Sequence, residues 1–570
     1  MKGTGVSPGI SIGNAFILKK SVVVSSGRTV ESEEEIIEQI SDFDKAVVAA
    51  ADEVKKIISD NKGIFKQEDI AILETQIEFI GDTQIMSDVH DKIRNERRTA
   101  IDSVTDAVGS MVHLFRNMDD AYLRARTTDI QDAGNRIIKH LLKRDDAPAH
   151  EYSENSIIIA EDITPTEAIT LDPRKIAGIV TLEGSRTSHA AIIARSRVIP
   201  AVAGCSEELM NINNNDTVII DGSTGDVIVD PDPETLNLFA EKKKVYDEHS
   251  KLLKSLRETP AITRDGRKIS IFGNISVPDD IDQLDENGGE GVGLLRTEIL
   301  FMMSDSFPSE EKQYQFYRQI ASKSGDKPVI IRTLDIGGDK QLPYFKIPEE
   351  QNPFMGYRAI RISLDKKDVF MTQIKAILRA SVSGNLKIML PMICKIDEVR
   401  EAKKLIGDAK TELDNAGKKY NPEIELGIMI EIPSAAMMVD LLSAEVDFFS
   451  IGTNDLCQYA MAVDRMNNKV SSLYDHFNPG LLRLINTIIE QAHIHNRKVG
   501  MCGEMASDPL ATMILLGMGL DEFSMSPPSI PEIKKIIRDN TLVRAREVWN
   551  KVKTLDSSDK IREYLQETLK

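Results

Sequence analysis

One histidine stands where phosphoryl chemistry would be favoured. His189 follows the Gly/Ser/Thr-rich turn 184–188 and precedes an apolar helical run, AAIIAR. The free N–H groups and the dipole of a helix N-terminus favour negative charge on or near such an imidazole. A phosphoryl group would therefore be stabilised there. The alternative is a surface histidine in a helix that Thr187 or Ser188 caps.

Two carboxylates supply a second candidate site. Glu431 and Asp455 each follow an apolar β-type run and offer hard oxygen atoms. Two such ligands are the usual protein share of a Mg²⁺ site, in which substrate and water complete the coordination. The alternative is that each carboxylate caps a neighbouring helix.

Arginines form a cationic set in the same half of the chain. They are Arg296 in GLLRTE, Arg332 in IRTLDIGGDK, Arg358 in NPFMGYRAIRI and Arg465 in AMAVDR. Guanidinium forks match phosphate and carboxylate groups bidentately and remain charged at any working pH. The set therefore suits a substrate that carries both groups. Arg361 has a structural alternative, as an ion-pair partner.

Cysteine spacing argues against a zinc site and a disulfide framework, because the four cysteines lack CxxC pairs. Cys502 in VGMCGEM is distinct, because Gly500 and Gly503 on either side permit close approach of a ligand. A buried free thiol is ordinarily an inert core residue. That interpretation is kept for Cys205, Cys394 and Cys457.

The elements that position these residues form a predicted (β/α)₈ barrel. Beyond Pro260, eight β-type runs alternate with helical ones: KISIFGN, GVGLLR, PVIIRTLD, LKIMLPMI, ELGIMIE, DFFSIGTND, KVGMCGE and EFSMSP. Such a barrel carries its chemistry at the C-terminal ends of the strands. The residues expected there are Asn274, Arg296, Arg332, Met392, Glu431, Asn454, Asp455, Cys502 and Ser526.

The first half of the chain contains two kinds of sequence pattern, one typical of strands and one typical of helices. GVSPGISIGNAFIL predicts a short strand with tight turns, and helical periodicity begins near Ser32. Amphipathic segments to residue 142 predict a bundle of four or five helices, and β-rich runs return from Asn155. The isolated strand must pack on the later sheet, which makes the bundle an insertion.

The predicted domain boundaries lie where these sequence patterns change. Residues 1–30 and 147–232 form an α/β domain, 31–146 an inserted helical domain, 233–260 a linker helix, and 261–570 the barrel. The insertion holds 16 Lys and Arg against 26 Asp and Glu. It has either an ordinary solvated surface or a docking face for a small, basic-faced protein.

Composition bounds the class of protein. The chain has 570 residues, 41% hydrophobic and 28% charged, which is typical of several globular domains. The net charge of -19 makes nucleic acid a poor partner. No run approaches the ~20 apolar residues of a membrane span, and the N-terminus lacks a signal-peptide pattern. No membrane insertion and a cytoplasmic location are therefore expected.

Two motifs resemble those of a known family. The run 184–195, with TSHAAIIAR at its end, and the run DFFSIGTNDLCQYAMAVDR (447–465) resemble the signatures of PEP-utilising enzymes. Across its length the chain is similar to enzyme I of the bacterial sugar phosphotransferase system. Pyruvate phosphate dikinase and phosphoenolpyruvate synthase fit less well, because both need an ATP-grasp region before the histidine domain. Ser185 departs from the Gly or Ala usual in the first motif.

The resemblance implies a role for each candidate residue. His189 is implied as the phosphoryl carrier, with Glu431 and Asp455 as Mg²⁺ ligands. The residues implied to bind phosphoenolpyruvate are Arg296, Arg332, Arg358, Asn454, Asp455 and Arg465. Cys502 is implied to protonate the enolate that phosphoryl departure leaves, a step suited to a weak acid of near-neutral pKa.

The resemblance also implies the partners. The helical insertion would dock the phosphocarrier protein HPr, the barrel would dimerise, and phospho-His189 would travel between barrel and carrier about the linker helix. Two alternatives remain. One is a regulatory nitrogen-system relative, which usually has an extra N-terminal sensory domain. The other is a catalytically inactive scaffold, against which the presence of His189, Asp455 and Cys502 argues.

Overall fold

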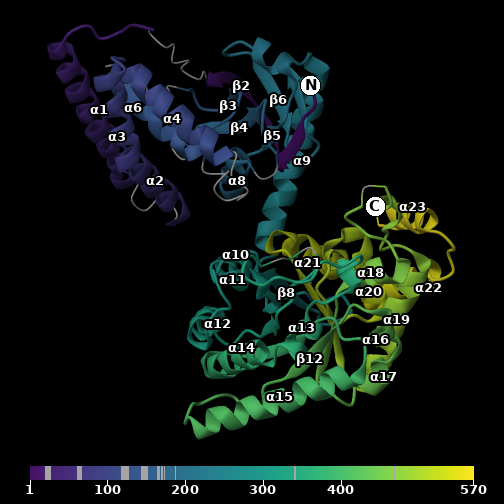
Figure 1. The fold of residues 1–570 in the computed structure, drawn as a ribbon. Helices are drawn as coiled ribbons and strands as arrows, with labels where there is room; N and C mark the ends of the chain where they lie inside the picture. The colour runs from purple at the N-terminus through teal and green to yellow at the C-terminus, as the bar shows by residue number, and fades with distance from the viewer. Residues whose placement is uncertain are drawn as a thin grey trace. The chain divides into compact units, whose positions relative to one another are not determined.

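The structure is a computed structural model of the chain, and it divides into two compact units, Met1–His249 and Ser250–Lys570 (Figure 1). It describes residues 1–18, 27–60, 67–116, 127–142, 152–163, 167, 171–172, 174–185, 188–338, 340, 342–467 and 469–569. Within these residues, no helix is both long enough and apolar enough to cross a bilayer.

A mixed sheet forms the α/β part of the first unit. Its strands are β1 (Thr4–Ser7), β2 (Ile10–Leu18), β3 (Ser156–Ala160), β4 (Ile176–Thr181), β5 (Ala201–Ala203), β6 (Thr217–Asp221) and β7 (Asp226–Val229), in the order β1-β5-β4-β3-β2-β6-β7. β2 pairs in parallel with β3 and antiparallel with β6. The prediction that the leading strand joins the later sheet is thereby confirmed.

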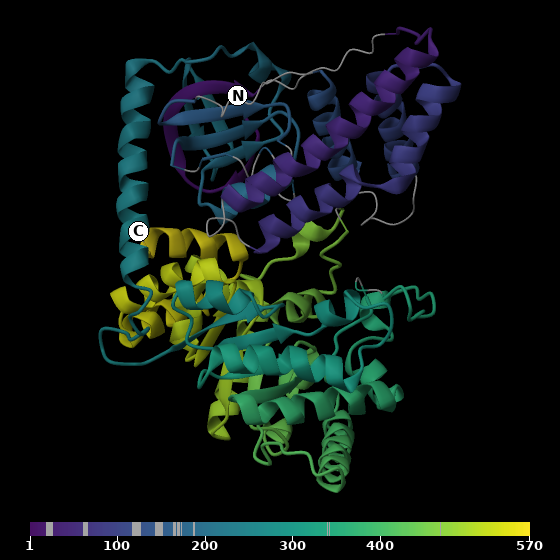
Figure 2. The ribbon, with the colours of Figure 1, turned by 90° about the vertical axis from the view of Figure 1, so that its left-hand side faces the viewer.

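The described residues between β2 and β3 are mainly helical, as the periodicity predicts. They are α1 (Glu33–Asp60), α2 (Gln67–Ile80), α3 (Thr83–Asn95), α4 (Ala100–Arg116) and α6 (Thr127–Leu141), purple to blue in Figure 2. The hydroxyl of Ser32 accepts the Glu35 N–H at 3.2 Å, which confirms the predicted helix start. Residues 122–126 of the last predicted helix lie outside the described residues.

The predicted linker is helix α9 (Pro233–Ser255). Asp232 accepts the Thr235 N–H at 2.7 Å, and Pro233 takes the first helical position, where its missing N–H costs nothing. A local cap and an N-terminal proline explain why the sequence alone places this helix correctly.

Eight parallel strands close the barrel of the second unit, at the positions expected from the sequence. They are β8 (Ser270–Ile275), β9 (Val292–Arg296), β10 (Val329–Arg332), β11 (Leu386–Leu390), β12 (Leu426–Ile430), β13 (Phe448–Ile451), β14 (Lys498–Met501) and β15 (Glu522–Met525). Buried aliphatic residues from the strands and the surrounding helices form one core. Because all the strands run the same way, their C-terminal ends share one rim.

A buried carboxyl group lies at the opposite end of the barrel. Oε1 of Glu522, the first residue of β15, has no hydrogen-bond partner among the described residues. Gly293 and Gly500 leave room for it, since a Cβ on either would come within 3.0 Å of Oε1. Burial raises the pKa of Glu522 to about 8, and neighbouring Lys387 and Lys498 only partly oppose that rise.

Glu522→Gln is expected to stabilise the barrel progressively as the pH rises from about 4.5 to about 8. In that window the folded carboxyl binds a proton that the unfolded one has lost, so wild-type stability falls with pH. The amide does not titrate. Urea unfolding across the window, with exposed Glu490→Gln as the control, measures the difference. A pH-independent difference would contradict the assignment.

Candidate active site at the C-terminal ends of the barrel strands

The rim of the barrel gathers most of the predicted site residues. Arg296 and Arg332 end β9 and β10, and Glu431 directly follows β12. Asp455 lies in the first turn of α18 (Thr453–Met461) after β13, and Cys502 directly follows β14. Parallel strands bring these separate segments to one rim, as the sequence predicts.

Arg332 lies in a buried ion network. Its Nη2 atom is 2.6 Å from Oε1 of Glu298 and 3.1 Å from Oδ2 of Asp335. Lys340 binds the same two carboxylates, at 2.9 and 2.8 Å. Burial opposes ionisation of Asp335, but the cations Arg332, Lys340 and Arg358 hold its pKa well below the usual range. The network is therefore ionised at neutral pH.

Arg358 connects this network to the second predicted carboxylate. Only 2% of its surface is exposed, and its Nη2 atom lies 3.1 Å from Asp335 and 3.2 Å from Oδ2 of Asp455. The next residue, Ala359, has a φ of 51°, and Gly337, with a φ of 99°, has no room for a Cβ beside Arg358. Strained backbone thus helps to place the guanidinium.

Glu431 is the fourth buried carboxylate of the rim. Its Oε1 atom accepts the Met392 N–H at 2.5 Å, and Met392 itself has a φ of 56°. Burial, together with the negative charges of Asp455 and Asp335, raises the pKa of Glu431 to about 8. Arg358 and Arg332 only partly offset this effect. Glu431 is therefore mainly protonated at neutral pH until another positive charge arrives.

Unpaired buried atoms show where ligands fit the rim. Oδ1 of Asp455, Nε of Arg332 and Nε of Arg358 are buried without a hydrogen-bond partner among the described residues. Such groups are costly to bury unless a ligand satisfies them. Asp455 and Glu431 offer oxygen atoms to a divalent cation, and the arginines offer N–H groups to an anion. The residues present fit both.

The other predicted residues lie around this core. Arg465 approaches Oδ1 of Asp455 at 3.7 Å. Oδ1 of Asn454 accepts the Glu504 N–H at 2.9 Å. Arg296 is exposed, and its positive charge acts on Cys502. Arg361 donates to the carbonyls of residues 355 and 356 at 2.8 and 2.7 Å, a structural role without an ion pair in the described chain.

Cys502 is at the predicted position but not with the expected acidity. The thiol is buried, and burial raises its pKa to about 11, although Ser450 and Arg332 partly oppose this rise. The near-neutral pKa expected from the sequence is therefore wrong, because packing against the barrel core removes water from the thiol. The thiol carries its proton throughout the neutral range.

His189 is the first residue of α8 (His189–Ser196) in the other unit. Ser188 is its N-cap, and its hydroxyl accepts the Ala191 N–H at 3.4 Å, which confirms the predicted helix start. The His189 side chain lies outside the described residues, as do Arg186 and Thr187 of the preceding turn. The structure thus places the backbone of His189 at a helix N-terminus.

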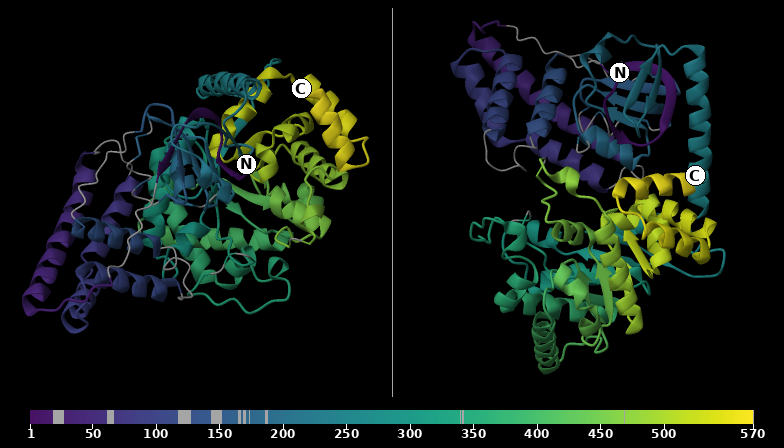
Figure 3. Two further views of the ribbon diagram at one scale, coloured as in Figure 1. Left: turned by 90° about the horizontal axis from the view of Figure 1, so that it is seen from above. Right: turned by 90° about the vertical axis from the view of Figure 1, so that its right-hand side faces the viewer.

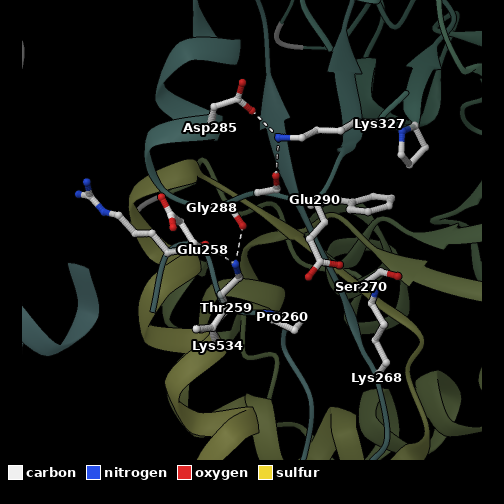
Figure 4. Close-up of a pocket in the computed structure, with 14 residues that line it drawn as sticks. Glu258, Thr259, Pro260, Lys268, Ser270, Asp285, Gly288, Glu290, Lys327 and Lys534 are labelled. Atoms are coloured by element: carbon white, nitrogen blue, oxygen red, sulfur yellow. Dashed lines mark hydrogen bonds and ion pairs between the residues drawn. The ribbon is translucent and has the colours of Figure 1, made fainter. Parts of the chain in front are cut away.

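A separate pocket of about 600 Å³ opens at the beginning of β8 and β9 (Figure 4). Lys534 projects into it from α21 (Ile530–Asp539), and its Nζ atom donates to the carbonyls of Arg257 and Gly288 at 2.9 and 2.5 Å. Lys327 pairs with Asp285 at 2.6 Å. The Lys534–Arg257 contact joins the segment after α9 to the barrel, whereas the Lys327–Asp285 pair joins two parts of the barrel itself.

Sequence reasoning missed part of the rim. Glu298, Asp335 and Lys340 stand in the motifs GLLRTE and IRTLDIGGDK, but the sequence analysis gives them no role. Their proximity to known candidates along the chain was the available signal. The positive φ of Ala359 and Met392 had no sequence signal.

Comparison with known proteins finds relatives over the whole chain. Models for the PEP-binding, N-terminal and mobile domains of PEP-utilising enzymes match residues 250–542, 2–126 and 152–225. The phosphoenolpyruvate-protein phosphotransferase of Bacillus subtilis (strain 168) is 41% identical over 570 residues, all of both chains. The Priestia megaterium protein of that name is 40% identical over 568 residues, covering 100% of this chain and 99% of its own.

Binding of a divalent cation to the rim is expected to strengthen as the pH rises to about 8, because Glu431 must lose its proton. Calorimetry with Mg²⁺, in two buffers of different ionisation enthalpy, measures both affinity and proton release. Glu431→Gln should weaken binding and abolish the release. Glu522→Gln, a carboxyl of similar pKa at the other end of the barrel, is the matched control. Unchanged proton release in Glu431→Gln would contradict the assignment.

Proposed function

The chain belongs to the PEP-utilising enzyme family, and from this we propose that it is the phosphoenolpyruvate-protein phosphotransferase of a sugar phosphotransferase system. It transfers the phosphoryl group of phosphoenolpyruvate first to His189 and then to a histidine of the phosphocarrier HPr. The observation that carries the proposal is the barrel rim, where Nε of Arg332, Nε of Arg358 and Oδ1 of Asp455 are buried without a hydrogen-bond partner among the described residues.

Phosphoenolpyruvate binds through the cations of the rim. Arg332 and Arg358 are fixed by Glu298, Asp335 and Asp455, so each guanidinium has a set orientation before the substrate arrives. Arg296, Arg465 and Asn454 complete the substrate-binding set. Preorganised donors stabilise the charge of a loose transition state without reorganising during the reaction.

Glu431 and Asp455 are the residues that would hold Mg²⁺. When bound, the cation neutralises phosphate charge and favours the ionised form of Glu431. Without the cation, burial and then the negative charges of Asp455 and Asp335 raise the pKa of Glu431. Two features support this assignment: Oδ1 of Asp455 has no hydrogen-bond partner among the described residues, and the pKa of Glu431 is raised.

The first transfer forms a bond from phosphorus to an imidazole nitrogen of His189 and breaks the bond from phosphorus to the enol oxygen. The electron pair stays with the enolate. Cys502 then gives its Sγ proton to the methylene carbon, which yields pyruvate, and the thiolate recovers a proton from water. A thiol that stays protonated at neutral pH is ready for this step.

The second transfer passes the phosphoryl group to HPr beside the helical insertion, residues 31–146. Its 26 acidic residues outnumber its 16 basic ones, which supports docking of a basic-faced carrier. One histidine that serves two sites requires its domain to move, with α9 as the hinge. Dimerisation through the barrel and a cytoplasmic location belong to the same proposal.

His189→Ala is expected to take up no label from radiolabelled phosphoenolpyruvate and Mg²⁺, whereas the wild-type protein acquires acid-labile, base-stable label. Loss of the imidazole removes the phosphoryl acceptor. His495→Ala, which removes an exposed histidine at the end of α19 (Pro479–Ile494), is the control and should label normally. Label retained by His189→Ala would disprove the assignment.

Cys502→Ser is expected to slow pyruvate formation by ~10²–10⁴-fold, because a hydroxyl is a weaker acid than a thiol. Phosphoenolpyruvate binding should change little, since the proton is needed only after phosphoryl departure. Turnover, calorimetric affinity and the stereochemistry of deuterium incorporation into the pyruvate methyl group measure the effect. Cys394→Ser is the control. Equal turnover with unchanged stereochemistry would make Cys502 a core thiol only.

A further inference from the structure

The segment between α18 and α19 carries Arg465 and is held by the last helix of the chain. That helix, α23 (Ser558–Thr568), is yellow near the C label in Figure 3. From it, Arg562 donates through Nη1 and Nη2 to Oδ2 and Oδ1 of Asp475, at 2.8 and 2.6 Å. This fork fixes orientation as well as distance, which a single ion pair would not do.

Phe477 makes further contacts with both partners of the ion pair. The Arg562 guanidinium lies over the ring of Phe477, 4.8 Å from its centre, and Phe477 is 2% exposed. Oδ1 of Asp475 additionally accepts the Phe477 N–H at 2.9 Å. Burial alone would raise the pKa of Asp475, but Arg562 and the Phe477 amide hold it below its ordinary value. Both partners are therefore charged and fixed at neutral pH.

The residue before Asp475 touches the substrate-binding residues. The hydroxyl of Tyr474 donates to the backbone carbonyl of Asn454 at 3.3 Å and lies close to the Arg465 guanidinium. Asn454 and Arg465 are 11 positions apart in the chain and enter the rim from different segments. Tyr474 is thus a shared neighbour of both, and its position depends on where Asp475 is held.

A second hydrogen bond holds residues 474–477, this time to helix α20 (Pro509–Met518). His476 hydrogen-bonds Asp508 at 2.9 Å, and Asp508 is the N-cap of α20. α23 in turn contacts α20 (Figure 1). Residues 474–477 are therefore held between two helices of the barrel's outer layer, rather than by local turn bonds alone.

We propose that Arg562 is a positioning residue for phosphoenolpyruvate: by clamping Asp475 it sets Tyr474, and through Tyr474 the positions of Asn454 and Arg465. The role rests on the proposed function of the rim. It assigns to the last helix, which contributes no residue to the rim described above, an effect on substrate affinity. If the Arg562–Asp475 ion pair served only to stabilise the fold, its loss would lower the stability of the protein and leave its affinity for phosphoenolpyruvate unchanged.

The test compares Arg562→Gln with wild type in the full chain. We expect KM and the calorimetric Kd for phosphoenolpyruvate to rise ~10- to 100-fold, with kcat changed much less, because misplaced binding groups weaken substrate capture. Arg562→Lys, which keeps the charge but not the fork, should recover part of the affinity. Lys560→Gln on the same helix removes the exposed pair with Asp556, at 2.8 Å, and should behave as wild type.

A double-mutant cycle tests the route through Tyr474. Tyr474→Phe removes the contact with the Asn454 carbonyl, and if Arg562 acts through it, the two losses of affinity will not add. An Arg562→Gln protein with wild-type KM and Kd would overturn the proposal, as would fully additive losses in the cycle. If Arg562→Gln does not fold, Arg562→Lys and Tyr474→Phe decide alone, and wild-type affinity in both would overturn it.

The failures of the two proposals are distinguishable. A wild-type protein that takes no label from phosphoenolpyruvate would refute the proposed function itself. A wild-type protein that labels normally, beside an Arg562→Gln protein that binds phosphoenolpyruvate equally well, would refute only the positioning role.

Discussion

The candidate site depends on the balance of buried charge at the rim of the barrel. Arg332, Lys340 and Arg358 face Glu298, Asp335 and Asp455, with separations of 2.6 to 3.2 Å between the paired atoms. A buried charge without a partner costs several kcal/mol. Each member is therefore tolerated only because the others are present. Among the described residues, the fourth carboxylate, Glu431, has no cation of its own in this network, and burial together with the negative charges of Asp455 and Asp335 raises its pKa to about 8.

Backbone conformation makes the balance possible. Ala359 and Met392 adopt left-handed φ values next to Arg358 and Glu431, at a cost of about 1–3 kcal/mol each. The barrel core on which these segments rest holds them there. The site is thus an arrangement of strained, charged segments on a rigid apolar scaffold, which is the arrangement that fixes ligand donors before a ligand arrives.

The two ends of the barrel differ in their buried polar groups. Within the described part of the chain, the C-terminal rim carries buried donors and acceptors that have no hydrogen-bond partner and that a ligand can satisfy. At the other end, Lys534 satisfies two backbone carbonyls, and Glu522 is buried between glycines. The ion pair between Arg562 and Asp475 joins the last outer helix to the segment that carries Arg465. The other end also holds buried atoms without a hydrogen-bond partner among the described residues, Nε of Arg257 and Oε1 of Glu522, so the rim is distinguished by the charge network around its unpaired atoms.

The sequence by itself determined the barrel, the helical insertion, the linker helix and the residues on the rim, because strand alternation, helical period and caps such as Ser32 and Ser188 are local signals. Tertiary structure alone decided the charge network and the acidity of Cys502. Lys340 and Glu298 are 42 positions apart, and Arg562 and Asp475 are 87 apart. Pairings at such separations, and the loss of water that raises a pKa, depend on which segments pack together, and no local pattern encodes that.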